Sequence, residues 1–343
     1  MSYDPIFIAG PDRSGTTLIY ALLASHPNIS MVRRTNLWRY FHKRYGELSQ
    51  PENFERCLSD MVRFNRMQHL QPDPERIRRE FWQGEPTYGR LFALFHEHVA
   101  ERRGKKRWGD KSLHTERHAD RVLAEYPNAK IIHISRDPRD RYASVRKRHG
   151  KDMPRLGAAT GRWLFSMSAA RRNLKRYPNN YMIIKFEELA SQPEEVLHKV
   201  CAFIGEEYTP AMLTMKGAAD HRDKGGNSSF GEIKPGVISK SPIGRFRTVL
   251  SKPEIAFIQL FTAREMKALG YSRERVRFSP VEFLKYYLWI LPNHLARMIG
   301  SMMLTARGIR RGERIPAHRL LDLSLNTPGG YDAKVKETAQ NQI

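Results

Sequence analysis

A glycine-rich turn near the start of the chain has the residue types of an oxyanion-binding loop. Residues 10 to 15 read Gly-Pro-Asp-Arg-Ser-Gly; an apolar segment precedes them, and two threonines open the helix-like segment that follows. Glycines let the backbone wrap around an oxyanion, and the free N–H groups at the start of the helix point toward it. The residues that we predict to bind a phosphate here are Arg13, Ser14, Gly15, Thr16 and Thr17.

This loop lacks the lysine of nucleoside triphosphate-binding loops. Those loops read Gly-x-x-x-x-Gly-Lys-Ser/Thr, and their lysine reaches the β and γ phosphates. Here Thr16 stands in the lysine position, and the basic residue is Arg13, two positions before Gly15. The motif therefore suits an anion on the 5′ position of a nucleotide better than it suits ATP or GTP with Mg²⁺. A P-loop kinase-like phosphotransferase stays open as an alternative.

A second motif follows the apolar residues 129 to 134. It reads Ser-Arg-Asp-Pro-Arg-Asp, and Ser144 lies about two turns into the helix that the proline opens. Residues 7 to 27 and 131 to 146 together resemble the 5′-phosphosulfate loop and the 3′-phosphate motif of PAPS-dependent sulfotransferases. The resemblance implies that the donor is PAPS, that the product is PAP, and that Arg136 and Ser144 hold the 3′-phosphate. A guanidinium makes paired charged hydrogen bonds to phosphate, and a hydroxyl adds a third.

Weaker resemblances to the same family fill much of the chain between residues 5 and 272. Residues 108 to 111, Trp-Gly-Asp-Lys, resemble its lysine-bearing strand, and parts of residues 181 to 205 resemble its late strand and helix. Residues 239 to 247 resemble its C-terminal donor-binding loop. The similarity is greatest to the bacterial branch that is similar to tyrosylprotein sulfotransferases. The loop residues that the resemblance implies as donor contacts are Ser241 and Arg245.

The acid that serves such enzymes as general base is missing from its usual place. Relatives of that branch often carry this glutamate shortly after a His-Pro pair, but residues 31 to 38 of this chain hold no acidic residue. Asp110 and Lys111 are adjacent on a predicted strand, so their side chains are expected to face opposite ways, with Lys111 toward the donor. The candidates for the base are His114, Asp110 and, as a lesser candidate, Glu85.

Transfer of a sulfuryl group needs little covalent help, because positioning and neutralisation of developing charge do most of the work. The resemblance implies that Arg13 and Lys111 stabilise the bridging oxygen as PAP leaves, while a base takes the acceptor proton. No metal is expected: the two cysteines are far apart, and the spacing of residues 114 to 118 does not match the zinc-protease motif. An exposed, charged helix is the favoured interpretation of residues 114 to 118.

These motifs lie on alternating strand-like and helix-like segments. Strands are expected at residues 5 to 9, 106 to 110, 129 to 134 and 181 to 186. Strands that alternate with helices favour an α/β fold with a P-loop-like central parallel sheet of about four to five strands, flanked by helices. Ligands of such sheets bind outside the carboxyl ends of the strands, so the donor is expected beside the first and third of these strands. The helices that we expect span residues 16 to 25, most of 36 to 105, 115 to 126, 156 to 176, 193 to 204 and 252 to 270, and residues 220 to 247 are expected to form an ordered loop or lid.

The chain of 343 residues has a formal net charge of +23, and 40% of its residues are hydrophobic. That is enough apolar material for a core, and the basic excess implies an anionic partner: a nucleotide, a membrane surface, or a sulfated or phosphorylated acceptor. We find no signal peptide and no stretch long enough to cross a bilayer, so a cytoplasmic protein is expected. No specific nucleic-acid partner is expected, because aromatic and basic residues interleave only at residues 38 to 45. A non-catalytic anion- or membrane-binding protein is a further alternative.

The composition changes near the end of the chain, and we divide the sequence into a sulfotransferase domain, residues 1 to 278, and a helical, basic extension, residues 279 to 343. Residues 281 to 306 are strongly apolar, Pro292 divides them into two helical pieces, and five arginines follow between residues 307 and 319. Such a pattern suits a helix that lies in the headgroup layer of an anionic membrane. The alternative is that these helices pack on the domain as additional core. The acceptor stays open among a glycan, a lipid, a peptide and a small natural product.

Overall fold

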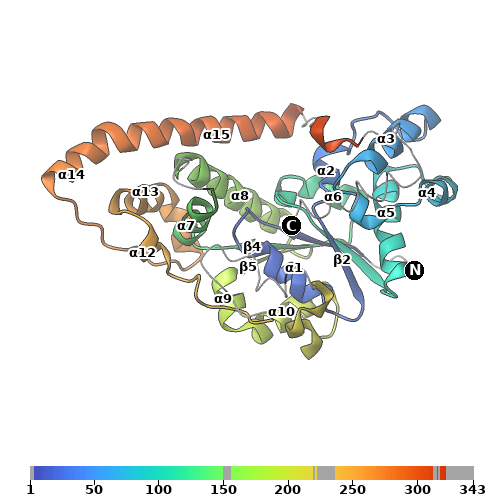
Figure 1. The fold of residues 1–343 in the computed structure, drawn as a ribbon, viewed down its shortest axis with the longest axis horizontal. Helices are drawn as coiled ribbons and strands as arrows, with labels where there is room; N and C mark the ends of the chain where they lie inside the picture. Colours follow the sequence, from blue (N-terminus) through green and yellow to red (C-terminus); the bar gives the residue numbers. More distant parts are fainter. Residues whose placement is uncertain are drawn as a thin grey trace.

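A parallel sheet runs through the centre of the molecule (Figure 1). The computed structural model describes residues 4–149, 156–218, 221, 236–311, 315 and 317–321. Within these residues β1 (Ile6–Ala9) is flanked by β3 (Arg107–Lys111) and β4 (Lys130–Ser135), while β2 (Ile29–Arg33) and β5 (Tyr181–Lys185) form the edges. The order β2-β3-β1-β4-β5, with every pairing parallel, confirms the predicted α/β fold.

The edge strand β2 was not among the predicted strands. Its residues, Ile-Ser-Met-Val-Arg, lie between the His-Pro pair that ends the first helix and a basic segment, too short a stretch for an alternating pattern to stand out. β2 pairs with β3 along its whole length, and Arg33 lies opposite Lys111. The segment after β2 is therefore placed at the same edge of the sheet as the ends of β1 and β3.

Successive residues of each strand point to opposite faces of the sheet, and a separate core forms on each face. Ile6 and Ile8 of β1 are buried on one face, whereas the Phe7 ring packs edge-on against Trp38 and Trp108 on the other. The helices that cover the first face are α1 (Thr16–Ala24), α9 (Phe186–Ser191) and α10 (Pro193–Ile204). The helices of the second face are α2 (Leu37–Tyr40), α3 (Pro51–Arg63), α4 (Pro74–Phe81), α5 (Tyr88–Arg102), α6 (Ala119–Glu125) and α8 (Leu156–Arg176).

A third core joins the C-terminal helices to the rest of the molecule. It is built on α7 (Pro138–His149), which follows β4, together with α12 (Phe246–Val249) and α13 (Lys252–Ala268). Tyr286 and Met298 from the extension are buried in the same core. The extension therefore takes part in the packing of the domain.

The extension runs as α14 (Pro280–Lys285), a π-helical turn (Tyr286–Ile290) and α15 (Leu291–Arg311) along the outside of α8 (Figure 1). Two glycines of α8, Gly157 and Gly161, allow the backbone of α15 to lie close to α8. A Cβ added at Gly157 would lie 1.8 Å from the carbonyl oxygen of His294 in α15, too close for any side chain. These contacts support the alternative in which the extension adds to the core.

Pro292 does not divide the extension into two separate helices. It lies directly after the π-helical turn, where the Leu291 N–H donates to the Tyr286 carbonyl oxygen five residues earlier, and the helix continues through this change from π-helix to α-helix. After α15 the described chain returns to the domain, where the Asn65 N–H donates to the Arg319 carbonyl oxygen at 2.9 Å. Most of the predicted lid lies outside the described residues, which include only His221 and residues 236–247 of it.

Candidate active site

The loop between β1 and α1 has backbone angles that only glycine adopts without strain. Gly10 has φ of 132°, and Gly15, the residue that caps α1, has φ of 93°. A Cβ at Gly10 would lie 2.5 Å from the Ile134 carbonyl oxygen, and one at Gly15 would lie 2.5 Å from the Phe186 ring. Thr16 and Thr17 begin α1 directly after this loop, so their N–H groups have no acceptor within the helix.

Arg141 of α7 holds this loop in place through hydrogen bonds to Asp12. Its guanidinium is almost fully buried and donates to the Asp12 carbonyl oxygen at 2.9 Å, to the Asp12 carboxylate and to the Ala159 carbonyl oxygen at 3.0 Å. Burial alone would raise the pKa of the Asp12 carboxyl, but the charge and hydrogen bond of Arg141 lower it to about 2. The loop is therefore held between β1 and α7 by a charged clamp that the sequence motif did not indicate.

Three of the predicted donor-binding residues meet at the ends of β1 and β4. The Arg13 Nε–H donates to the Ser144 hydroxyl at 2.8 Å. The Arg136 guanidinium donates to the Arg13 carbonyl oxygen at 3.2 Å and to the Pro242 carbonyl oxygen at 2.7 Å, and it lies 4.7 Å from the Phe186 ring centroid. The structure thus brings the phosphate loop, the second motif and the 239–247 loop together at one point.

Two buried polar atoms at this point have no hydrogen-bond partner among the described residues: Ser14 Oγ and Arg136 Nε. Burial lowers the pKa of the Arg136 guanidinium, while the nearby carboxylates of Asp140, Glu187 and Asp137 act in the opposite direction. A buried hydroxyl and a buried guanidinium beside glycines that allow close approach fit a phosphorylated ligand.

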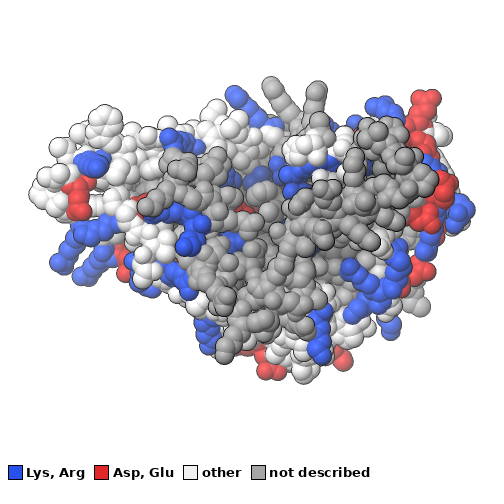
Figure 2. All heavy atoms as spheres, in the orientation of Figure 1, with Lys and Arg blue, Asp and Glu red and all other residues white. Residues whose placement is uncertain are grey.

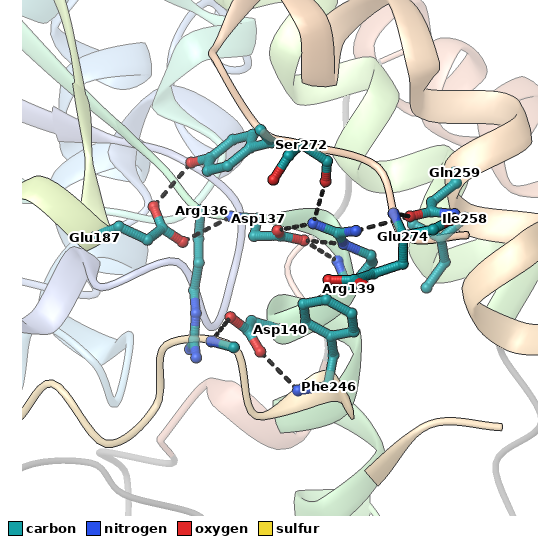
Figure 3. Close-up of polar contacts among 12 residues, drawn as sticks. Arg136, Asp137, Arg139, Asp140, Glu187, Phe246, Ile258, Gln259, Ser272 and Glu274 are labelled. Atoms are coloured by element: carbon teal, nitrogen blue, oxygen red, sulfur yellow. Dashed lines mark hydrogen bonds and ion pairs between the residues drawn. The ribbon is translucent and has the colours of Figure 1, made fainter. Parts of the chain in front are cut away.

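The remaining charges of the second motif hold the C-terminal part of the domain in place (Figure 3). The Asp140 carboxylate accepts the backbone N–H groups of Gly244 at 2.6 Å and Phe246 at 2.8 Å. Arg139 donates to both oxygens of Asp137 and to Gln259 at 2.7 Å, and its guanidinium stacks on the Phe246 ring. Of the four charged residues, Arg136 is the one directed toward the phosphate loop.

Ser241 and Arg245 lie in the loop that Asp140 holds. Ser241 is exposed and bonds locally to Ser239, directly before the Pro242 carbonyl that Arg136 contacts. Arg245 lies between the two residues whose N–H groups Asp140 accepts. Both residues are thus placed near Arg136 by the backbone, and their contacts with a donor stay a prediction.

Replacing Asp140 by alanine is expected to release the 244–246 segment, because one buried and one partly buried N–H group lose a charged acceptor worth about 1.5–3 kcal/mol per bond. We expect hydrogen exchange of the Gly244 and Phe246 amides to accelerate about tenfold or more, measured by mass spectrometry. Asp120→Ala removes an exposed carboxylate on α6 and serves as the matched control. Unchanged protection at both amides in Asp140→Ala would show that Asp140 does not hold the loop.

Asp110 and Lys111 end β3, beside the start of the phosphate loop, since Lys111 pairs with Ile8. Burial lowers the pKa of Lys111 to about 7, and the positive charges of Arg34 and Arg33 contribute to this shift. Burial raises the pKa of Asp110 to about 6, although its carboxylate accepts hydroxyl hydrogen bonds from Thr35 at 2.6 Å and Ser112 at 3.0 Å. The Asp110 carboxylate is therefore already occupied by hydrogen bonds within the fold.

The prediction of an exposed helix for residues 114 to 118, and of one helix from 115 to 126, is wrong. Thr115–Arg117 forms a single 3-10 turn, and α6 begins only at Ala119. Glu116 is fully buried, because it accepts the Gly10 N–H at 3.2 Å and the Ser166 hydroxyl at 2.7 Å. Hydrophobic periodicity cannot predict this burial, since Glu116 is buried by its hydrogen bonds to the phosphate loop and α8.

The three candidates for the general base differ in their surroundings. Glu85 is exposed in the turn before α5, and Asp110 is fully enclosed by its hydroxyl partners. His114 lies directly before the 3-10 turn, with Nδ1 3.7 Å from the Glu116 carboxylate. Burial lowers the pKa of His114, although Glu116 opposes the shift, so a neutral ring able to accept a proton is favoured. Among the described residues, no group of three His, Cys, Asp or Glu side chains is placed to hold a metal.

Comparison with known proteins identifies the fold and the family. The model of the sulfotransferase family matches residues 5–210, more than half of the chain, and no curated protein matches. The sulfotransferase domain of the Synechococcus PCC 7002 olefin synthase is 22% identical with a TM-score of 0.54, over 80% of this chain and 96% of that domain. The sulfotransferase domain from the curacin biosynthetic pathway is 20% identical with a TM-score of 0.55, over 79% of this chain and 99% of that domain. A mouse sulfotransferase complexed with PAP is a more distant match, 14% identical with a TM-score of 0.42, over 78% of this chain and 85% of that protein.

The olefin synthase and curacin-pathway domains share the fold of this chain, and the family match includes both phosphate motifs. The chain belongs to the sulfotransferase family.

Proposed function

We propose that this sulfotransferase uses PAPS as donor and transfers the sulfuryl group to a hydroxyl or amine, releasing PAP. The observation that carries the proposal is the meeting of Arg13, Ser144 and Arg136 at the ends of β1 and β4. A nucleotide with phosphates on its 5′ and 3′ positions would be held at one end by the N–H groups of α1 and at the other by Arg136 and Ser144. The 239–247 loop, fixed by Asp140, would close over it.

Different residues at this edge of the sheet would carry out different parts of the reaction. The acceptor oxygen attacks sulfur as the bond between sulfur and the 5′-phosphate oxygen breaks, and PAP leaves with that electron pair. Arg13 and Lys111 would neutralise the charge that develops on the leaving oxygen. His114 would take the proton of the acceptor hydroxyl, because its ring is neutral and less enclosed than Asp110.

The test is transfer of labelled sulfate from PAPS to pools of candidate acceptors, with products identified by mass spectrometry. Thermal shift with PAP and with ATP plus Mg²⁺ separates this proposal from its alternatives. Stabilisation by PAP together with labelled product supports sulfuryl transfer from PAPS. Stabilisation by ATP plus Mg²⁺ alone would favour a phosphotransferase. No response to either nucleotide, with salt-dependent binding to anionic surfaces, would favour a non-catalytic anion-binding protein.

We further propose that the protein is cytoplasmic and attaches to an anionic membrane through the extension, residues 279 to 343, while residues 1 to 278 carry the reaction. The segments α14, the π-helical turn and α15 expose large apolar side chains to solvent. Examples are Leu284, 60% exposed, Leu288, 62%, and Leu304, 68%. The surface over α14 and the first turns of α15 is largely free of charged side chains, and Lys and Arg side chains gather along its lower margin (Figure 2). No helix among the described residues is long and apolar enough to span a bilayer.

Glutamates in place of Leu288 and Trp289 are expected to abolish this attachment. Trp289 is 75% exposed, so its loss leaves no cavity in the core, but each side chain would contribute about 1.5–3 kcal/mol of apolar burial at the membrane. We expect co-sedimentation with phosphatidylglycerol liposomes to fall at least about tenfold. Leu260→Glu, on α13 and 50% exposed, is the matched control.

Point substitutions are preferable to truncation at residue 278, because Tyr286 and Met298 belong to the core and their removal would destabilise the domain. Equal liposome binding of the wild type and the double variant would reject the attachment. The oligomeric state of the wild type and of the double variant is measured by analytical ultracentrifugation. If the wild type is a dimer and the double variant a monomer, this face binds a second copy of the chain and not a membrane.

A further inference from the structure

Glu116 is a fully buried carboxylate that contacts the phosphate loop. Its Oε2 accepts the Gly10 N–H at 3.2 Å, and its Oε1 accepts the Ser166 hydroxyl of α8 at 2.7 Å. The side-chain amide of Asn173, also in α8, donates to the Glu116 carbonyl oxygen at 2.8 Å and so holds the backbone of this turn. A carboxylate is buried only where donors satisfy it, and here one donor is the first residue of the phosphate loop.

The chain turns sharply at His114, between β3 and the 3-10 turn that contains Glu116. His114 has φ of 71°, in the left-handed region that residues with a side chain seldom adopt and that persists where the surrounding structure enforces it. The turn brings the His114 ring beside the carboxylate, with Nδ1 3.7 Å from Glu116 Oε1. Nδ1 is buried and has no hydrogen-bond partner in the part of the chain that the structure describes. The Glu116 carboxylate is therefore in place to accept an Nδ1–H of this ring.

The surroundings of the pair decide its charge state. Burial alone would raise the pKa of the Glu116 carboxyl, but the interaction with His114 and the charges of two further basic side chains hold it well below its usual range. Burial lowers the pKa of the His114 ring, while the nearby carboxylates act in the opposite direction. At neutral pH the pair is thus a neutral ring beside a carboxylate. The titratable and charged side chains that act on this pair, or that it acts on, are Asp12, Arg117, His118, His133 and Tyr181.

We propose that Glu116 is a positioning residue of the transfer reaction: one carboxylate oxygen holds the start of the phosphate loop, and the other orients the His114 ring. The inference rests on the proposed function, because it takes His114 to be the group that accepts the acceptor proton. With Nδ1–H directed to Glu116, the free electron pair of the neutral ring is on Nε2. The acceptor oxygen bonds to sulfur as the bond from sulfur to the 5′-phosphate oxygen breaks, and Nε2 takes the acceptor proton. The imidazolium then lies beside a carboxylate that stays ionised.

The position of the ring proton tests this directly. It is measured from the nitrogen NMR shifts of the histidine rings in isotope-labelled protein saturated with PAP, at a pH at which the ring is neutral, and His114→Asn identifies the signals. We expect the Nδ1–H tautomer in the wild type. In Glu116→Gln the amide oxygen can still accept the Gly10 N–H, which leaves the amide NH2 facing the ring. That NH2 donates to Nδ1, so the Nε2–H tautomer is expected in this variant.

The matched control is Glu125→Gln in α6. Glu125 also accepts a glycine N–H, that of Gly89 at 2.8 Å, and also lies beside a histidine ring, 3.4 Å from His42 Nε2. The control therefore makes the same chemical change outside the site. We expect it to leave the His114 tautomer, PAP affinity and turnover unchanged.

Glu116→Gln also separates the two roles of the carboxylate. PAP affinity, measured by calorimetry, should stay within about threefold of the wild type, because the bond to Gly10 is kept. Turnover with an acceptor from the labelled-sulfate assay should fall about 10²-fold or more, because the ring no longer presents a free electron pair on Nε2. Glu116→Ala removes both contacts and should weaken PAP binding about tenfold as well.

An Nε2–H tautomer in the wild type, or an Nδ1–H tautomer that persists in Glu116→Gln, would overturn the proposal, and the wild-type spectrum decides even where a variant does not fold. Equal losses of turnover and PAP affinity in Glu116→Gln would also contradict it, because they would show that Glu116 acts on the loop alone. If the wild type neither binds PAP nor transfers sulfate, the proposed function fails. The ring spectrum of the nucleotide-free protein then decides separately whether Glu116 orients His114.

Discussion

Replacement of Arg136 by alanine is expected to weaken PAP binding by about 2 kcal/mol or more, roughly 30-fold in dissociation constant. The guanidinium is 6% exposed, and its contacts are two backbone carbonyls and a ring face, so no carboxylate neutralises it by direct contact among the bonds described above. A phosphate placed there gains paired, charged hydrogen bonds in a setting of low dielectric. Calorimetric titration with PAP measures the effect.

Adenosine 5′-phosphate, which lacks the 3′-phosphate, isolates the contribution of Arg136. The wild type should bind PAP much more tightly than this nucleotide, and Arg136→Ala should bind the two with similar affinity. Arg171→Ala, which removes a partly exposed arginine from α8, is the matched control. If Arg136→Ala weakens both nucleotides by the same factor, Arg136 acts on the loop in general and does not recognise the 3′-phosphate.

Replacement of Lys111 by methionine is expected to lower turnover about 10²-fold or more while PAP affinity changes little. The ammonium would act mainly on the charge of the leaving oxygen, which is greatest in the transition state. The same substitution should stabilise the fold by about 1–3 kcal/mol at pH 6, because methionine fills the space without a buried charge. Steady-state kinetics and chemical denaturation measure the two effects.

The pKa of Lys111 sets how this stabilisation depends on pH. Burial and the neighbouring arginines lower the pKa to about 7 in the folded protein, from a usual value of 10.5. Between these two values the unfolded chain binds more protons, so the unfolding free energy of the wild type rises with pH. The advantage of Lys111→Met should therefore be largest below pH 7 and shrink as pH increases. Lys130→Met, at the start of β4, is the control; full turnover in Lys111→Met would exclude the catalytic role.

The sequence by itself determined the strand, loop and helix segments that carry the two motifs. Residues 5 to 15 and 129 to 138 are local patterns: a buried strand, a turn rich in glycine or proline, and a helix start. Their physics depends on neighbours a few residues away, so the pattern appears in the sequence and predicts the place of each motif in the sheet. The family match and the parallel sheet confirm these inferences.

Only the tertiary structure decided what the charged residues of the motifs do. Asp140 and Gly244 are 104 residues apart, and Glu116 and Gly10 are 106 residues apart. No periodic pattern connects such pairs, because each contact depends on which strands become neighbours in the sheet. The same reason explains why Glu116 was expected on the surface: a carboxylate is buried only when distant partners satisfy it.

In the extension, some features follow from the sequence and others follow only from tertiary packing. Its apolar composition and its helices follow from residues 281 to 306, but the sequence could not show which apolar side chains face inward. Gly157 of α8 admits the backbone of α15, so Met298 is buried while Leu304 stays 68% exposed. Packing between elements far apart in the chain selects among the faces that a helical pattern makes available.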